Sequence, residues 1–539
     1  MIVEECKLPK ANQLVADYLA GEINAQRFFD YDYRDLDTYL LRVRDLKEQI
    51  FPREALVEHL LTFNRKFTSH PNVFENIEKL RLDNSAVVIT GQQAGFLTGP
   101  LYTIYKAVST VMLAKQLEEK LNIPVAPVFW VAGEDHDFQE VNHVWVFHDQ
   151  LEKEIYRDFR NEGKPISMIA IDKKRMEQWL DRVFYAFGET KHSKHVLDFV
   201  RQKLEVSHTV SDFFIRIMSS FFEKHGLIFV DSANEELRNI EAAFFHELVK
   251  RNEQLRNRFH EQSEEIVRFG YPLGVDAERE CVHLFYHDGE KRRLLYEENG
   301  LYQSKDKAIA LTKEELVKIC SQSPAKLSNN VVTRPLMQEY LFPTLAFVAG
   351  PGEITYWAQL KSCFHLFNKK MPPIVPRMHV TIVERNVHKL IRKFNLSLDE
   401  ILSSGVSKYR EEWFKQQKGD KAQQVMAEVK EMVDLAHAKL RKFAWETDHN
   451  LGQISEKNRQ LILQQLDYME KRIEKFYEDR FSKELSAFNE IEAHILPNGN
   501  LQERVWNIFY YANQYGIAFI DSLFIKHELG HAKHHILYI

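Results

Sequence analysis

The sequence predicts an α/β protein: a doubly wound, mostly parallel sheet followed by an α-helical coiled coil. Short apolar runs alternate with amphipathic helical patterns, an order that is typical of parallel sheets covered by helices. Glycine is scarce, with 20 residues among 539, which favours helices over the many turns of an all-β chain. After residue 385, apolar residues recur at spacings of three and four with charges between them, as in a coiled coil.

Composition and charge exclude several classes of protein. Apolar residues make up 44% and charged residues 28% of the chain, so a largely disordered protein is excluded. The net charge is −6, whereas proteins that coat nucleic acid are usually basic, so we expect no nucleic-acid partner. The four cysteines lie far apart and form no CxxC pair, which fits a reducing compartment. No signal-peptide pattern or membrane-length apolar run is present, so we expect a cytoplasmic protein without a membrane partner.

The first part of the core is expected to be a strand–helix–strand unit that follows a helical stretch of about 80 residues. Ser85–Thr90 and Val125–Val131 are apolar runs typical of buried parallel strands. The helix between them begins at Pro100, which loses no hydrogen bond at a first helical position, and ends at Asn122.

Two insertions are expected to interrupt the core. The alternation of strand and helix returns around Asp231 and again from the strand that ends at Gly350 to the strand before Arg377. Between these parts lie two charged helical patterns and a group of short alternating runs typical of an antiparallel sheet. The expected parts are 1–150, core, first part; 151–225, helical insertion; 226–264, core strand and helix; 265–325, small β-containing insertion; 326–385, core, second part; 386–500, coiled coil; and 501–539, a C-terminal segment that docks on the core.

The coiled coil is expected to be an antiparallel hairpin with roughly 25 to 40 residues in each arm. One apolar run extends from Val425 to Phe443 and a second from Ile462 to Phe476. An ordinary bundle packed on the core is the alternative. A projecting apolar seam usually finds a partner, so we expect a homodimer.

Polar, glycine-rich turns follow the predicted strands, where ligands bind in open parallel sheets. Gly91–Gly99 places glycines at a helix start, which suits an anion or a nucleotide, although it matches neither common nucleotide fingerprint. Gly133–Asp137 combines three carboxylates with an imidazole, which suits acid–base chemistry, and a solvated turn is the alternative. Gly350–Glu353 again places glycines beside the start of a helix. Arg334 and Arg377 could bind an acidic substrate or form structural ion pairs.

These turns provide the candidate site residues. The catalytic candidates are His136 and Asp135. The candidate substrate- or nucleotide-binding residues are Gln92, Gln93, Gly95, Gly99, Tyr102, Asn330, Arg334, Gly350, Pro351, Gly352, Glu353, Tyr356 and Arg377. We assign no metal ligand. His527, Glu528 and His531 match the HExxH pattern of zinc hydrolases, but a catalytic zinc needs a third protein ligand, and the later histidines do not fit the known spacing.

Five segments resemble those of the bacillithiol biosynthesis cysteine-adding enzymes, a family of cysteine ligases. They are GQQAGFLTGPLYTIYK, PVFWVAGEDHDFQEVNHV, FVAGPGEITYWAQLK, PPIVPRMHVTIVE and LPNGNLQER. The resemblance spans essentially the whole chain. It implies a Rossmann-like core similar to class I aminoacyl-tRNA synthetases and related nucleotidyltransferases, two connecting-peptide insertions, and a coiled coil that mediates dimerisation. It further implies the addition of L-cysteine to the amine of glucosaminyl-malate.

Amide formation requires an activated carboxylate, so the resemblance implies ATP as a cosubstrate that lies over the start of the helix at Gly91–Gly99. His136 or Asp135 would handle the proton, while Asn330, Arg334 and Arg377 would hold malate carboxylates or phosphates. The chain lacks the HIGH and KMSKS signatures of class I synthetases, so adenylation and phosphorylation both stay open, as does a metal requirement. A non-catalytic dimeric scaffold is the alternative from another class, and it is favoured if the polar turns do not converge on one cavity.

Overall fold

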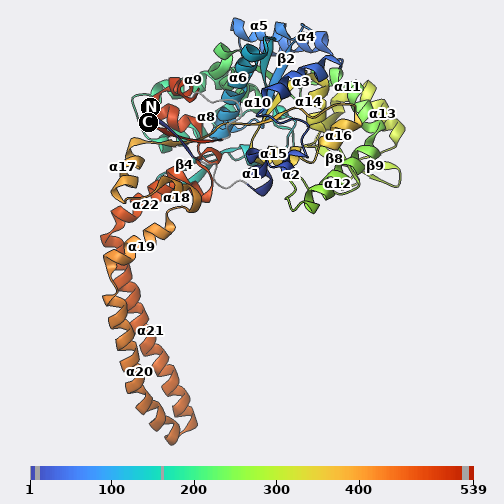
Figure 1. The fold of residues 1–539 in the computed structure, drawn as a ribbon. Helices are drawn as coiled ribbons and strands as arrows, with labels where there is room; N and C mark the ends of the chain where they lie inside the picture. Colours follow the sequence, from blue (N-terminus) through green and yellow to red (C-terminus); the bar gives the residue numbers. More distant parts are fainter. Residues whose placement is uncertain (1, 7–11, 159–162, 290, 525–532) are drawn as a thin grey trace. The chain divides into compact units, whose positions relative to one another are not determined.

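The computed structural model describes residues 2–6, 12–158, 163–289, 291–524 and 533–539 (Figure 1). The chain forms two compact units. The first contains Met1–His148, Glu152–Thr381 and Gln502–Leu537, and the second contains Asp149–Leu151, Ile382–Leu501 and Tyr538–Ile539. Within the described residues, no helix combines the length and the apolar character that crossing a membrane requires.

The centre of the first unit is a five-stranded parallel sheet in the order β13-β12-β2-β3-β6. Its strands are β2 (Ala86–Gln92), β3 (Val125–Val131), β6 (Ile228–Asp231), β12 (Thr344–Ala349) and β13 (Ile374–Pro376). Nearly all of their residues are buried, because helices cover both faces of the sheet. These strands coincide with the predicted apolar runs, and the predicted α/β fold class is confirmed.

Helix α6 (Leu101–Leu121) connects β2 to β3 and packs against both strands. Pro100 stands one residue before this helix, at the N-cap with extended backbone, so its predicted place as the first helical residue is wrong by one position. Asn122 ends the helix in the left-handed conformation, as the sequence indicated. The predicted single helix after Gly350 is broken into two helices, α15 (Pro351–Trp357) and α16 (Lys361–Leu366).

Further helices surround the sheet, and short strands lie near the chain ends. The helices are α1 (Gln13–Ala20), α2 (Ile23–Gln26), α3 (Leu36–Lys47), α4 (Arg53–Asn64), α5 (Pro71–Lys79), α7 (Phe138–Val141), α11 (Glu235–Lys250), α12 (Asn252–Arg268), α13 (Lys313–Gln322), α14 (Thr333–Leu341) and α23 (Ile508–Tyr515). The strands β1 (Ile2–Cys6), β14 (His379–Val383) and β15 (His534–Tyr538) form a three-stranded sheet. The sequence did not indicate β1.

The two insertions differ in architecture. The first (151–225) holds β5 (Leu151–Ile155), which pairs with β4 (His143–Phe147) just before it, and three helices where two were expected: α8 (Lys173–Phe187), α9 (Ser193–Glu205) and α10 (Val210–Phe222). The second holds a five-stranded antiparallel sheet in the order β10-β9-β8-β7-β11. Its strands are β7 (Cys281–His287), β8 (Arg292–Glu298), β9 (Leu301–Ser304), β10 (Ala310–Leu311) and β11 (Leu327–Asn329).

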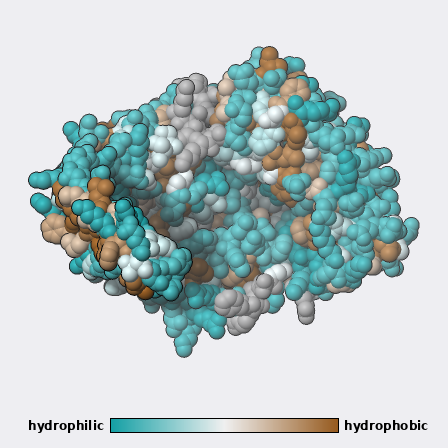
Figure 2. All heavy atoms as spheres, turned by 90° about the horizontal axis from the view of Figure 1, so that it is seen from below, coloured by the Kyte–Doolittle hydropathy of each residue, from teal (hydrophilic) through white to brown (hydrophobic). Residues whose placement is uncertain are grey.

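The second unit is helical and contains the predicted hairpin. Its helices are α17 (Arg385–Lys393), α18 (Leu398–Ser404), α19 (Ser407–Lys418), α20 (Lys421–Thr447), α21 (His449–Arg480) and α22 (Ser482–Ile495). Helices α20 and α21 are 27 and 32 residues long and lie side by side over their length (Figure 1). Large apolar side chains remain exposed on this hairpin, including Met432 at 60%, Leu435 at 66% and Phe443 at 66%. Figure 2 shows such brown side chains among teal ones on the hairpin, at the lower left.

Candidate active site

A cavity of about 530 Å³ lies beyond the carboxyl ends of the central strands. Its lining comes from the ends of β2 and β3, from α14 and α15, and from the antiparallel sheet of the second insertion. Small-molecule sites usually measure ~300–1,000 Å³, so the volume fits such a site. The predicted residues that line this larger cavity are Gln92, Gln93, Asp135, His136, Asn330, Arg334, Glu353 and Tyr356.

Glu353 of α15, which lines the larger cavity, forms an ion pair with the buried Lys106 of α6. Lys106 Nζ lies 2.6 Å from Glu353 Oε2, and it donates hydrogen bonds to Gly91 O at 2.7 Å and Gln92 Oε1 at 3.0 Å. Glu353 also accepts a hydrogen bond from Gly350 N at 2.8 Å, which closes the first turn of α15. Burial lowers the pKa of Lys106, and the neighbouring carboxylate only partly offsets this effect. The pair therefore ties the end of β2 to the start of α15.

Arg334 is the cationic residue of the lining that has no carboxylate partner among the described ion pairs. It stands in the first turn of α14, where one guanidinium nitrogen donates to the hydroxyl of Tyr356. Gly91 is required by the neighbouring strand, since a Cβ at that position would lie 2.9 Å from Trp130 O, and no ion pair or other side-chain hydrogen bond of Arg334 is found in the described structure. The remaining guanidinium donors of Arg334 are therefore available to an anion in the cavity.

His136 lies between an acid and an arginine. Its Nδ1 is 3.7 Å from Asp135 Oδ1 and 3.4 Å from Arg292 Nη1, and its ring meets Phe285 edge-on. Burial and the Arg292 guanidinium lower the pKa of His136, so the ring is neutral at pH 7. Because Nδ1 faces a donor, this geometry favours the tautomer with the proton on Nε2.

Arg292 reaches the site from the second insertion and is held on several sides. It donates to Ser328 Oγ at 3.0 Å and to Asn329 O at 2.5 Å, and its guanidinium lies 3.7 Å from the centre of the Phe285 ring. The side chain is 6% exposed, so its position is fixed by burial as well as by these bonds. The insertion therefore contributes a positive charge to the site, although no site residue was predicted within its expected range.

A buried charge cluster lies behind Asp135. Arg238 of α11 pairs with Glu134 and, at 2.7 Å, with Glu241. Burial raises the pKa of Glu241 to about 7, against the opposing effect of Arg238. Glu134 is also 4.0 Å from Arg292 Nη2. This cluster anchors the turn after β3, because it binds the residue directly before Asp135.

Two predicted binding residues have structural partners. The Asn330 side chain accepts hydrogen bonds from Val332 N at 2.8 Å and Thr333 N at 3.2 Å, and so caps the start of α14. Arg377 lies outside the lining of the larger cavity and forms a two-bond ion pair with Glu503, with distances of 2.9 and 2.6 Å. For Arg377 the structure thus supports the ion-pair alternative, because both terminal guanidinium nitrogens bond to Glu503 in the interior.

The Gly91–Gly99 loop is closely packed rather than open. A Cβ on Gly95 would lie 2.8 Å from Gly99 Cα, and Gly99 itself has a φ of +71°. The N–H groups of Gly95 and Gly99 donate to carbonyls within the loop. Asn507 Nδ2 donates at 2.8 Å to the carbonyls of both Leu97 and Gly99. This pattern argues against phosphates bound by the N–H groups of Gly95 and Gly99, because both groups already have partners.

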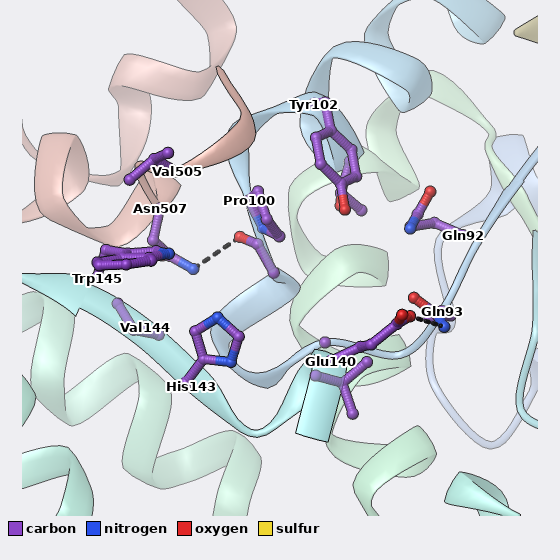
Figure 3. Close-up of a pocket in the computed structure, with 14 residues that line it drawn as sticks. Gln92, Gln93, Pro100, Tyr102, Glu140, His143, Val144, Trp145, Val505 and Asn507 are labelled. Atoms are coloured by element: carbon purple, nitrogen blue, oxygen red, sulfur yellow. Dashed lines mark hydrogen bonds between the residues drawn. The ribbon is translucent and has the colours of Figure 1, made fainter. Parts of the chain in front are cut away.

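A smaller pocket, shown in Figure 3, adjoins the larger cavity. It takes in Gly95, Gly99 and Tyr102 among the predicted residues, and it shares Gln92 and Gln93 with the larger cavity. The predicted binding residues are thus distributed over two neighbouring spaces. Gly350, Pro351 and Gly352 line neither of them. They begin α15 and thereby position Glu353 and Tyr356.

Comparison with known proteins covers the whole chain. Residues 1–378 match the family model described as the N-terminal Rossmann-like domain of bacillithiol biosynthesis BshC, and residues 380–539 match the C-terminal coiled-coil domain of the same family. The chain is 38% identical over 542 residues to a protein of Geobacillus sp. strain WCH70 and 37% identical over 538 residues to one of Bacillus cytotoxicus, with 100% of each chain covered. Both relatives carry the name "Putative cysteine ligase BshC".

The chain belongs to the BshC family. The family resemblance inferred from the five sequence segments is confirmed, and so are the Rossmann-like and coiled-coil parts of the predicted fold. The larger cavity lies within the Rossmann-like domain of this family member, since all its lining residues precede residue 378.

Sequence reasoning missed several residues of this BshC site. Lys106 is one lysine on an otherwise largely apolar helix segment, a pattern that could have signalled a buried functional cation. Arg292 stands in KRRLL, where nothing in the local pattern separates it from a solvated neighbour. Asn507 of the smaller pocket lies more than 400 residues from Leu97 and Gly99, and Glu503, which pairs with Arg377 outside both spaces, lies 126 residues from it, so only the fold reveals these partners.

The metal question was left open, and the described part of the chain contains no group of three or more His, Cys, Asp or Glu side chains placed to hold a metal ion. The HExxH motif at His527, Glu528 and His531 lies outside the residues that the structure describes.

Proposed function

We propose that this chain joins L-cysteine to the amine of glucosaminyl-malate, which gives bacillithiol, with ATP as the activating cosubstrate. Membership of the BshC family over the full length carries this proposal. Residues of the turns after β2 and β3 and of the start of α15 line one cavity at the strand ends, which supports an enzyme over a scaffold, since a scaffold has no need of such a cavity.

The reaction needs an activated carboxylate because a free carboxylate is a poor electrophile. ATP would transfer either its AMP or its γ-phosphoryl group to a cysteine carboxylate oxygen, with release of pyrophosphate or ADP. The neutral amine of the sugar then attacks the acyl carbon. The C–N bond forms, the bond to AMP or phosphate breaks, and the amine loses one proton to a base. Both routes are consistent with the proposed chemistry.

Three side chains have suitable positions for this chemistry. Arg334 would bind an anionic group, either a malate carboxylate or a phosphate, because its guanidinium lacks a carboxylate partner among the described ion pairs. His136 would donate from Nε2 to the oxygen that gains negative charge at the acyl carbon, since Nδ1 faces Arg292. Asp135 is 30% exposed and would accept the proton from the attacking amine.

We include two further points in the proposal. The exposed apolar side chains of the α20–α21 hairpin support a homodimer formed through this hairpin, which light scattering of the purified protein would test. No disulfide joins the four cysteines in the described structure, which supports work in a reducing compartment such as the cytoplasm.

The decisive experiment incubates the purified full chain with glucosaminyl-malate, L-cysteine and ATP, and follows bacillithiol, AMP and ADP by mass spectrometry. Formation of bacillithiol with AMP supports adenylation, and formation with ADP supports an acyl phosphate. The variant His136→Ala is expected to fold and to lose most of the rate. Absence of bacillithiol from the wild-type reaction, with the protein folded, would refute the proposal in this form.

A further inference from the structure

The smaller pocket of Figure 3 is distinct in size from the larger cavity. Its volume is about 30 Å³, against about 530 Å³ for its neighbour. A single water needs ~10–15 Å³ on this measure, so the pocket holds a few small chemical groups and no nucleotide or sugar. Of the proposed substrates, only the amino acid is small enough to place most of its groups in this space and the rest in the larger cavity.

The polar groups around the pocket suit a small cation-bearing ligand. Glu140 of α7 lines it, whereas no lysine or arginine belongs to its described lining. Figure 3 shows Tyr102 of α6 and His143 of β4 pointing toward the pocket from opposite sides. Burial lowers the pKa of His143, so its ring is neutral at pH 7 and can take part in a hydrogen bond with a thiol. An anion would be repelled by Glu140, which argues against a phosphate here.

A buried hydroxyl in the lining has no partner. Thr103 follows Tyr102 on α6 and is 0% exposed, and its Oγ1 has no hydrogen-bond partner in the described structure. Buried hydroxyl groups are normally hydrogen-bonded, so the Thr103 hydroxyl is open to a polar atom of a ligand in this pocket. The pocket therefore combines an acid, a neutral imidazole and a free hydroxyl within one small space.

We propose that this smaller pocket is the L-cysteine subsite, with Glu140 as the partner of the ammonium group and His143 and Thr103 facing the side chain. This inference rests on the proposed function, since it assigns one of its substrates. Trp145 and Val144 supply apolar surface beside these groups, and a thiol packs well against an aromatic ring.

The two spaces share lining residues, so a cysteine bound in the smaller pocket could react in the larger cavity. Gln93 lines both spaces, and its Nε2 donates at 2.8 Å to Glu140 and at 2.7 Å to Asp135. Because the pocket accommodates only a few groups, the carboxylate of the bound cysteine would extend past Gln92 and Gln93 into the larger cavity. There it would meet the activating group and the sugar amine beside Asp135 and His136.

The test is calorimetric titration of the full chain with L-cysteine under reducing conditions, without glucosaminyl-malate or ATP. We expect Glu140→Gln to weaken L-cysteine binding at least tenfold. The matched control is Glu119→Gln, which removes an exposed acid at the far end of α6 and is expected to leave binding unchanged. The analogue 3-mercaptopropionate keeps the thiol and carboxylate but lacks the ammonium, so it should bind weakly, and equally to wild type and to Glu140→Gln.

Three results would overturn the assignment: no binding of L-cysteine to the folded wild type, unchanged binding to Glu140→Gln, or tight binding of 3-mercaptopropionate. The product assay separates this inference from the proposed function. Weakened cysteine binding in Glu140→Gln together with no product from wild type would refute the function and keep the subsite. Product from wild type together with unchanged cysteine binding in Glu140→Gln would refute the subsite alone.

Discussion

Replacing Arg377 with glutamine is expected to destabilise the first unit without touching the larger cavity. The Arg377 and Glu503 side chains are 2% and 1% exposed, and two hydrogen bonds join them. Burial alone would raise the pKa of Glu503, but Arg377 and His379 hold it well below 4.5. Removing Arg377 takes away the strongest effect that lowers this pKa, so the buried Glu503 carboxylate is left with only His379 beside it, and burial then raises its pKa.

The expected loss follows from that unpaired charge. Breaking one side of a buried ion pair costs about 3–5 kcal/mol, far more than the net contribution of an exposed pair. We expect the unfolding temperature of Arg377→Gln to fall by at least ~3 °C, measured by calorimetry and by circular dichroism. The double variant Arg377→Gln with Glu503→Gln should recover part of the loss, because it removes the unpaired carboxylate as well.

One combination of stability and activity would refute the structural role of Arg377. If Arg377→Gln melted with the wild type yet lost its activity, Arg377 would act on a substrate and the ion pair would not be its main role. Arg334→Gln is the matched comparison, since both arginines were candidates from the sequence. Its melting temperature is expected to stay within about 1 °C of wild type, because Arg334 has no carboxylate partner among the described ion pairs.

The remaining predictions concern activity, pH and the glycine loop. Arg334→Gln should lower kcat/KM roughly 10- to 100-fold, as expected for a lost charge-assisted hydrogen bond of ~1.5–3 kcal/mol, and an unchanged value would exclude Arg334 from substrate binding. The part of the acid limb of the kcat/KM profile that disappears in His136→Ala should lie below 6.5, because His136 acts in the neutral form and its pKa is lowered; a limb above 6.5 that depends on His136 would contradict this role. Glu241 has its folded pKa raised to about 7, so its contribution to stability should decline as the pH rises from about 4.5 to about 7, and urea midpoints of Glu241→Gln should lack this decline. Asn507→Ala should lower the free energy of unfolding by ~1–3 kcal/mol, because two loop carbonyls lose their hydrogen bonds. An unchanged urea midpoint would show that the loop does not depend on Asn507.

The core strands were predictable because burial on both faces leaves a clear trace in a sequence. The bounds of Val125–Val131 were predicted to the residue, since a short, continuous apolar run is typical of a parallel strand that is buried on both faces. The hairpin was equally clear, because charges on both sides of an apolar stripe repeat over many turns. Two elements were missed: β1 has only five residues, and α10 of the first insertion is largely apolar, so it lacks the charged helical pattern by which the insertion was recognised.

Tertiary structure decided which polar residues work together. The sequence left the same two interpretations for Arg334 and Arg377, a contact with a substrate or a structural ion pair. The fold separated them by placing Glu503 beside Arg377 and a cavity beside Arg334. Only the fold showed that Lys106 and Arg292 lie at the site, because their partners come from elements far away in the chain.

The sequence by itself determined the fold class, the family and the strand ends at which the polar turns gather, since these follow from local period and from motifs of adjacent residues. Only the tertiary structure decided that the turns line two spaces of unequal size, joined by Gln93. The physical reason is that a cavity is defined by side chains from several elements. Its shape and charge depend on distances that no single stretch of sequence contains.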